Sequence, residues 1–265
     1  MAEQKTQISL QMYTLRRVDL PQEEMLKKVR EIGYQSIQGG RPRGQTKEQY
    51  KDFLDGLGLE MSTYGGDLKS MDEDPESYIN ECKFFGVEDI MIGTMPTEYR
   101  ENYDTYMKGI DYLNGIGRKL YQGGCYLAYH NHAQEFRRFK NGKTGMDLLY
   151  ENLDPNGVRF ILDTHWVQAG GADVLQWIEK CKGRMQNIHV KDYRIASNNH
   201  MTVLEYTDKQ FAEIGEGNLP WPEIIALCQA QGIKYFIVEQ DESYGRDPFD
   251  CIATSLANLQ KYGLK

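Results

Sequence analysis

Tyr129-His130-Asn131-His132-Ala133-Gln134-Glu135 closes a short strand-like run, and three later runs end in a similar way. They are Leu162-Asp163-Thr164-His165, Ile188-His189-Val190-Lys191-Asp192 and Ile237-Val238-Glu239-Gln240-Asp241. Each run carries a carboxylate or an imidazole at its carboxyl end. If parallel strands close into a barrel, these ends converge on one mouth, where such side chains can bind a divalent ion. The pattern predicts a metalloenzyme.

Strand-like runs alternate with amphipathic, helix-like stretches along the whole chain. The predicted strands are 8–13, 34–38, 59–63, 89–93, 125–130, 159–163, 186–190 and 235–239. Thr46 and Gln49 form a predicted capping box at one helix start, and Asp74-Pro75 marks another. Gly33, Gly58 and Gly86 stand where such helices should end.

Eight strand–helix repeats with short connections predict a (β/α)8 TIM barrel. The 265 residues, of which 40% are hydrophobic, can bury a large core, so we expect one α/β domain over residues 1–265. The segment 194–218 is the one long loop candidate, and we expect it to be able to cover the site.

The composition narrows the function classes. A net charge of -8 disfavours a broad nucleic-acid surface, so we expect no nucleic-acid partner. Five scattered cysteines indicate reduced thiols rather than a disulfide framework. The absence of a signal-like start or a long apolar run predicts a cytoplasmic protein without membrane attachment. Glycine-rich phosphate-binding motifs are absent as well, so we expect no nucleotide cofactor.

Several motifs, in this order, resemble those of one enzyme family. They are Gln11-Met12-Tyr13-Thr14-Leu15-Arg16, the Tyr-His-Asn-His-x-x-Glu-Phe run at 129–136, Leu162-Asp163-Thr164-His165-Trp166-Val167, His189-Val190-Lys191-Asp192, Gly215-Glu216-Gly217-Asn218 and Val238-Glu239-Gln240-Asp241. Together they resemble the sugar phosphate isomerase/epimerase family. This is the xylose isomerase-like TIM barrel group, which also includes inosose dehydratases and endonuclease IV.

The resemblance implies a divalent ion, often manganese, held by Glu, Asp, His and Glu from the fifth to the eighth strand. Asp163, His189 and Glu239 match three of these positions. The glutamate of strand five is missing, and Glu135, just beyond that strand, is the expected substitute. Carboxylates with one imidazole favour a hard ion, so manganese comes first, with magnesium, zinc or cobalt as alternatives.

Proton transfer is assigned to Glu239 together with one of His130, His132 or Lys191. His130 and His132 share parity on an extended strand, so they can face one side, and either could instead only orient a metal ligand. For Lys191 the structural alternative is a salt bridge with Asp192 or Asp163.

The remaining candidates are expected to bind the substrate, a small sugar or sugar derivative. They are Tyr13, Arg16, His165, Trp166, Glu216 and Arg246. Aromatic rings can stack on a sugar face, and arginine can meet a hydroxyl, carboxylate or phosphate. Structural roles, such as a ring that plugs the barrel or a surface charge, stay open for them. Homo-oligomerisation stays open too.

A Lewis-acidic ion on a carbonyl makes the neighbouring C–H proton more acidic. Returning that proton elsewhere isomerises or epimerises the sugar, whereas expelling a leaving group from the next carbon gives dehydration or glycoside elimination. We place isomerase/epimerase ahead of lyase/dehydratase. An abasic-site endonuclease and a catalytically inactive sugar-binding barrel are the alternatives from other classes; the acidic charge disfavours the first, and the retained candidate ligands disfavour the second.

Overall fold

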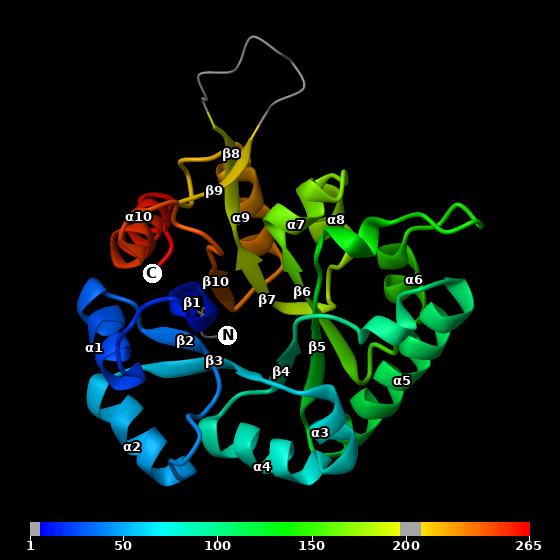
Figure 1. Ribbon diagram of the computed structural model, residues 1–265, viewed down its shortest axis with the longest axis horizontal. Helices are drawn as coiled ribbons and strands as arrows, with labels where there is room; N and C mark the ends of the chain where they lie inside the picture. The colour runs from blue at the N-terminus through cyan, green and yellow to red at the C-terminus, as the bar shows by residue number, and fades with distance from the viewer. Residues whose placement is uncertain (1–5, 197–207) are drawn as a thin grey trace.

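Eight parallel strands close into a barrel at the centre of the molecule (Figure 1). The computed structural model describes residues 6–196 and 208–265. Around the barrel the strand order is β1, β10, β7, β6, β5, β4, β3 and β2. The barrel strands are β1 (Gln7–Gln11), β2 (Ser36–Gly39), β3 (Glu60–Gly65), β4 (Asp89–Ile92), β5 (Tyr126–His130), β6 (Val158–Asp163), β7 (Met185–Val190) and β10 (Tyr235–Val238). The (β/α)8 prediction is confirmed.

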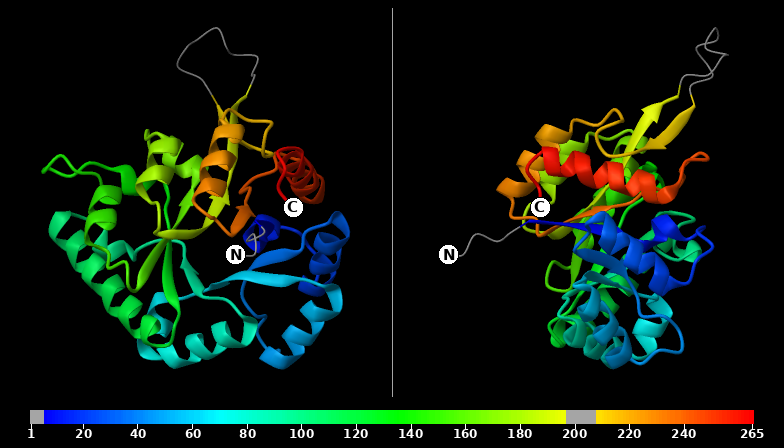
Figure 2. Two further views of the ribbon diagram at one scale, coloured as in Figure 1. Left: turned by 180° about the vertical axis from the view of Figure 1, so that it is seen from behind. Right: turned by 90° about the vertical axis from the view of Figure 1, so that its left-hand side faces the viewer.

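Helices form a ring outside the strands, as Figures 1 and 2 show. They are α1 (Gln22–Ile32), α2 (Lys47–Leu57), α3 (Leu68–Glu73), α4 (Pro75–Phe85), α5 (Tyr103–Gln122), α6 (Gly145–Asn152), α7 (Thr164–Ala169), α8 (Val174–Lys180), α9 (Trp221–Ala230) and α10 (Pro248–Lys261). Short 3-10 turns follow β1, precede α5 and follow β5; they are η1 (Met12–Leu15), η2 (Thr97–Tyr99) and η3 (Ala133–Phe136).

The helix boundaries follow local chemistry. Thr46 and Gln49 form the predicted capping box of α2, and Asp74 caps α4 ahead of its first-turn proline. Gly58 and Gly86 end these two helices in the left-handed conformation, which costs glycine little. The sequence therefore determined where these helices begin and end.

One predicted loop contains regular structure. The strand β8 (Asp192–Ile195) runs into the segment 194–218 that was expected as a long loop, and it pairs antiparallel with β9 (Lys209–Ala212) inside that segment. Residues 197–207 of the segment lie outside the described residues. This hairpin extends outward beyond the helices (Figure 2). The loop prediction is wrong for these strands, because a four-residue strand supported by a single partner leaves little periodic signal.

The two faces of the barrel strands differ in chemistry. The outer face packs apolar residues such as Leu10, Ile37 and Ile188 against the helices. The inside carries polar side chains, and the hydroxyls of Ser9 and Ser62 lie 2.8 Å apart. The interior is thus a hydrogen-bonded core whose upper layer can carry chemistry.

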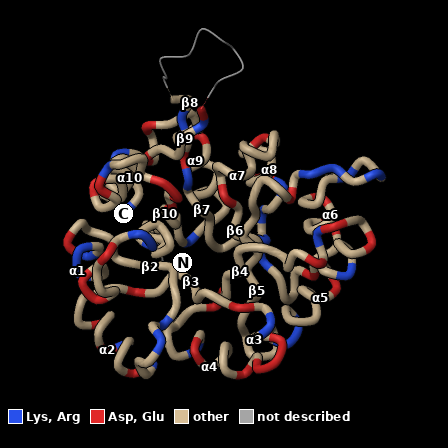
Figure 3. The backbone as a smooth tube through the Cα atoms, viewed as in Figure 1, with Lys and Arg blue, Asp and Glu red and all other residues tan. Residues whose placement is uncertain are grey.

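Charged residues are distributed over the helical ring. Figure 3 shows acidic and basic residues interspersed along the outer helices. Within residues 6–196 and 208–265, no helix combines the length and apolar character needed to cross a membrane.

Helix α5 approaches the start of β6 where Gly117 faces Gly157. A Cβ on Gly117 would lie 2.8 Å from a methyl carbon of Val158 and 2.9 Å from the Gly157 carbonyl oxygen. A Cβ on Gly115, in the same helix, would have no heavy atom within 4 Å. A side chain therefore fits at Gly115 and not at Gly117.

Gly117→Ala should lower the free energy of unfolding by about 1–3 kcal/mol, because the added methyl group forces α5 away from β6. Urea denaturation measures this change. The matched control Gly115→Ala should be neutral or stabilising by up to about 1 kcal/mol, since alanine is the better helix former. Equal stability of the two variants would contradict the close packing.

Candidate metal centre and active site

Four side chains converge at the carboxyl ends of neighbouring strands. His130 ends β5, Asp163 ends β6, His189 lies in β7, and Glu239 directly follows β10. One potential ligand atom from each lies within 4.8 Å of the other three. All four residues are buried. We call these residues the central cluster.

The central cluster is closely connected. The Nδ1 of His189 lies 2.8 Å from the Oε2 of Glu239, and the Nε2 of His130 lies 3.2 Å from the Oδ2 of Asp163. The Nε2 of His130 is also 3.9 Å from the Oε2 of Glu239. Two carboxylates and two imidazoles therefore face one small volume.

Backbone contacts hold Asp163 in place. Its Oδ1 accepts a hydrogen bond from the backbone N–H of Trp166 and so caps α7, while its backbone N–H donates to the side chain of Asn131. The second oxygen, Oδ2, is left to face His130 and Lys191. The strand-to-helix turn thus orients this carboxylate before any ligand binds.

Lys191 lies inside the same cluster. Its ammonium Nζ is 3.2 Å from Asp163, 3.0 Å from Glu239 and 2.9 Å from Asp241. Its side chain is only 1% exposed. The expected salt bridge with Asp163 is present, whereas Asp192 instead accepts hydrogen bonds from the Trp221 indole and backbone N–H groups.

Opposite charges in the cluster stabilise each other's charged forms. Burial alone would raise the pKa of Asp163, but Lys191 and His130 lower it to about 2. Burial would raise the pKa of Glu239 as well, but Lys191 and His189 outweigh burial, and the pKa lies well below its usual value. Burial would lower the pKa of Lys191, yet Asp163, Glu239 and Asp241 raise it above its ordinary range. Lys191 is therefore a fixed cation, and a role as a neutral base is disfavoured.

The donor set fits a divalent ion. Carboxylates and imidazoles together suit manganese, zinc, cobalt or magnesium better than a thiolate-seeking ion. The other ring nitrogen of His189, Nε2, is 2.6 Å from the amide oxygen of Gln38, the type of outer contact that orients ligating histidines. An ion bound here would share Asp163 and Glu239 with the Lys191 ammonium.

Glu135 does not join the central cluster, which corrects the expectation for strand five. Its Oε2 accepts from the backbone N–H of His132, and its Oε1 accepts from the Tyr129 hydroxyl. Tyr129 and His130 are adjacent in β5 and so point to opposite faces of the barrel wall. Glu135 thus lies with Tyr129 on the outer side, and His130 stands at the inner position.

His132 and three neighbouring side chains carry buried polar atoms without a hydrogen-bond partner. The atoms are Asn131 Nδ2, His132 Nδ1, His165 Nδ1 and Trp166 Nε1. The ring of His132 lies 4.8 Å from that of His130, as their shared parity predicted. Burial and the nearby His130 lower the pKa of His132 to about 4, so its imidazole is neutral near pH 7. Buried polar groups usually have a partner, so a bound polar ligand is one way to satisfy these atoms.

An aromatic wall stands beside Lys191. The His165 ring is 4.7 Å from Trp166, 4.8 Å from Phe211 and 5.4 Å from Tyr193. The Nζ of Lys191 lies 5.3 Å from the centre of the Trp166 ring. The hairpin β8–β9 supplies Phe211 and Tyr193, so it forms part of the wall.

The other expected substrate-binding residues lie farther out. Arg16 stacks on Tyr13, which is 55% exposed, and donates to the backbone carbonyl of Asp241. Arg246 pairs with Glu213 at 2.7 Å and lies 3.7 Å from Glu216. Arg16 therefore reaches the cluster indirectly, through the backbone of Asp241 and of Tyr13, and Arg246 pairs with Glu213 and Glu216 rather than with the cluster.

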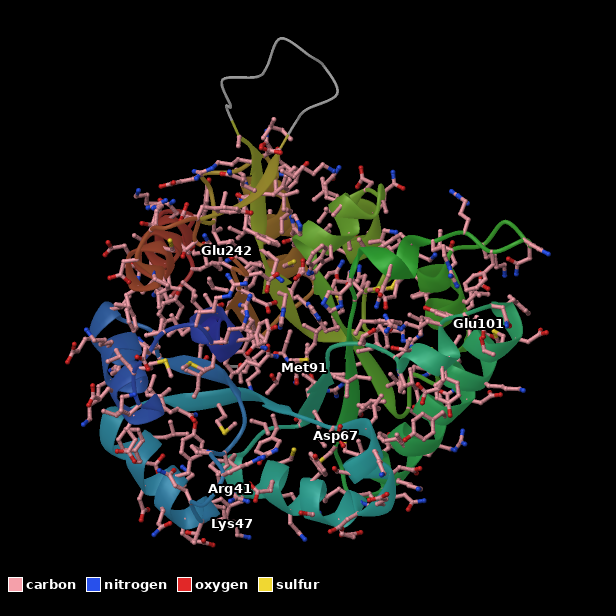
Figure 4. The ribbon with its side chains drawn as sticks, viewed as in Figure 1. Arg41, Lys47, Asp67, Met91, Glu101 and Glu242 are labelled. Atoms are coloured by element: carbon pink, nitrogen blue, oxygen red, sulfur yellow. The ribbon has the colours of Figure 1, made fainter. Side chains whose placement is uncertain are left out.

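Figure 4 shows the distribution of the side chains over the barrel. The labelled Glu242 lies beside β10 and pairs with Arg17, whereas the labelled Arg41 lies across the barrel near α2 and pairs with Glu81. Arg41 and Arg17 are thus already neutralised by local carboxylates.

Sequence reasoning missed three residues near the centre. Gln38 ends a predicted strand, but an isolated glutamine there has no distinctive signal. Asp241 stands in a quoted motif, and its spacing from Glu239 could have indicated a shared side. Phe211 lies in the segment expected as a loop, so only the hairpin reveals it.

Residues 26–262 match the profile of the xylose isomerase-like TIM barrel family. The chain belongs to this family. The match covers most of the chain and agrees with the central cluster at the carboxyl ends of β5, β6, β7 and β10. The resemblance seen in the sequence is thereby confirmed.

Individual relatives are distant. The inosose dehydratase of Geobacillus thermodenitrificans is 25% identical over 85% of this chain and 70% of its own length. A crystallised sugar phosphate isomerase/epimerase from Parabacteroides distasonis superposes with a TM-score of 0.78 at 23% identity, covering 98% of this chain and 94% of that one. A probable 3-DHS dehydratase from Bacillus anthracis gives 0.72 at 15% identity, covering 96% and 99%. At these identities the two structures show the fold alone.

Lys191→Met should lower the free energy of unfolding of the metal-free protein by about 3–5 kcal/mol, because Asp163, Glu239 and Asp241 then lose their buried counter-charge. Chemical denaturation in the presence of a chelator measures the change. The control Lys51→Met breaks an exposed pair with Asp55 and should cost no more than about 1 kcal/mol. A Lys191→Met protein as stable as its parent would contradict the charge balance described here.

Proposed function

We propose that this protein is a divalent-metal-dependent enzyme that removes the proton next to a carbonyl group of a sugar or sugar derivative. The observation that carries the proposal is the central cluster beside two unlike groups, the buried ammonium of Lys191 and the neutral imidazole of His132. Such a site offers a fixed positive charge and a proton acceptor side by side at the carboxyl ends of the barrel strands.

The proposed metal ligands are His130, Asp163, His189 and Glu239. When bound, the ion supplies Lewis acidity that polarises a substrate carbonyl. Manganese is the first choice, with magnesium, zinc or cobalt as alternatives. His130 thus takes the ligand position that the sequence had suggested for Glu135, and Glu239 serves as a ligand rather than the base.

His132 is the proposed base. Its ring nitrogen Nδ1 has no partner, and its depressed pKa keeps the imidazole unprotonated near neutral pH. Lys191 lies beside the carboxylates and adds positive charge where the substrate oxygen becomes negative, which favours the transition state over the ground state. His132 therefore moves the proton and Lys191 stabilises charge.

We place elimination ahead of epimerisation, which reverses the order favoured by the sequence alone. Epimerisation needs proton donors and acceptors on both faces of one carbon, and the strand-five glutamate that would provide the second face is replaced by His130. Elimination needs one base, which can pass its proton to the departing oxygen. The relative named inosose dehydratase supports this choice. The proposed reaction is loss of water or of a glycosidic oxygen from a keto-sugar.

Isomerisation or epimerisation is the second candidate. The neighbour from Parabacteroides distasonis described as a sugar phosphate isomerase/epimerase favours it. Both reactions share the first step, so they differ only in the destination of the proton. Product analysis separates them.

Asp163→Asn and Glu239→Gln should each lose most bound metal after incubation with MnCl2 and desalting, because each removes one charged oxygen from the ligand set. Elemental analysis measures the metal content per chain. Glu135→Gln is the matched control, since its carboxylate faces Tyr129 and His132 rather than the cluster, and it should retain the ion. Undiminished metal in both cluster variants would remove the proposed site.

In deuterated water the Mn²⁺-treated protein should exchange the proton next to the carbonyl of its keto-sugar substrate, and His132→Asn should slow this exchange by about 10²–10⁴-fold. Proton NMR of candidate ketoses, inososes and 3-keto-glycosides measures the exchange. Gln134→Asn, at an exposed position of the same loop, should exchange at the parental rate. Neither exchange nor an elimination product with any sugar that demonstrably binds would contradict enolate chemistry.

A further inference from the structure

A chain of buried amides connects the first two strands of the barrel to the central cluster. Gln11 at the end of β1 donates from Nε2 to the Oε1 of Gln38 in β2, at 2.5 Å. The same oxygen of Gln38 lies 2.6 Å from the Nε2 of His189. Gln38 is fully buried, and Gln11 is 6% exposed.

The direction of every hydrogen bond between Gln11, Gln38 and His189 follows from one backbone group. The backbone N–H of Tyr13 can only donate, and it donates to the Oε1 of Gln11 at 3.1 Å. The other end of the Gln11 amide is therefore its NH2 group, which must donate to Gln38. Gln38 thus presents its oxygen, and its own NH2 group donates to the Thr63 hydroxyl at 2.5 Å.

An amide oxygen can only accept, so the ring nitrogen that meets it must carry a proton. We propose that Gln11 and Gln38 form a relay that keeps a proton on Nε2 of His189. The opposite nitrogen, Nδ1, is then the one left to face Glu239. Gln11 and Gln38 are positioning residues, because they act through His189.

The proton on Nε2 has a consequence for the cluster. Nδ1 of His189 and Oε2 of Glu239 lie 2.8 Å apart, so they share either a proton or a cation that both contact. Since the relay occupies Nε2, Nδ1 is the nitrogen that would ligate the proposed metal. This last consequence rests on the proposed function, whereas the proton on Nε2 does not.

The tautomer can be read directly in the full-length, chelator-treated protein. Labelling the ring nitrogens of histidine with ¹⁵N and recording two-bond ¹H–¹⁵N correlation spectra distinguishes the two neutral tautomers and the imidazolium. His189 is identified by the signals that His189→Asn removes. We expect a proton on Nε2 in the parent, and an unprotonated Nε2, as in the Nδ1–H tautomer, would overturn the proposal.

Two variants and a control test the relay itself. Gln38→Leu removes the acceptor, and Gln11→Leu removes the group that orients it, so each should shift His189 toward the other tautomer. The second variant keeps Gln38 and serves if the first does not fold. Thr63→Val removes only the partner of the Gln38 NH2 group and should leave the tautomer unchanged. An unchanged tautomer in the folded relay variants would also overturn the proposal.

Titration calorimetry with MnCl2 separates the relay from the metal site. Gln38→Leu should bind Mn²⁺ about 10–100-fold more weakly than the parent, while Thr63→Val should bind within a few-fold of it. If the parent carries a proton on Nε2 but binds no ion, the relay stands and the proposed metal function fails. Equal Mn²⁺ affinity of the parent and Gln38→Leu would count against the relay as a metal-orienting device.

Discussion

The burial of charge at the barrel mouth governs the rest of this site. Asp163 and Glu239 lie in the barrel with almost no access to water, and an uncompensated buried charge costs several kcal/mol. The Lys191 ammonium compensates part of this cost by contacting both carboxylates and Asp241. With one ammonium facing three carboxylates, a surplus of negative charge is left. That surplus is the physical reason to expect a further cation among these groups.

Closure of the barrel is what makes the cluster possible. The first strand pairs with the last, so Leu10 lies opposite Val238, and Gln11 and Gln38 come close to His189. Residues from the two ends of the chain thereby share one interior layer. An open sheet would leave β1 and β10 as separate edges, and the amides of the first two strands would have no route to the histidine of the seventh.

The surroundings of the cluster divide into two kinds of contact. On the side of the barrel interior, polar side chains hold the cluster residues by directional hydrogen bonds, as Gln38 does for His189. On the other side, Trp166 and Phe211 form an aromatic wall next to Lys191 and leave polar atoms such as Trp166 Nε1 without a partner. The first arrangement fixes geometry, whereas the second gives a ligand both an apolar surface and unsatisfied hydrogen-bonding groups.

The sequence by itself determined the barrel, the boundaries of several helices and the approach of Asp163, His189 and Glu239. It could do so because strand and helix periods, caps and strand ends are local features, and parallel strands must bring their carboxyl ends together. Only the tertiary structure placed His130, and not Glu135, in the central cluster, because a side chain beyond a strand can turn to either face of the barrel wall. Contacts between distant strands and the pairing of β8 with β9 likewise placed Gln38 and Phe211, since neither contact leaves a pattern in the local sequence.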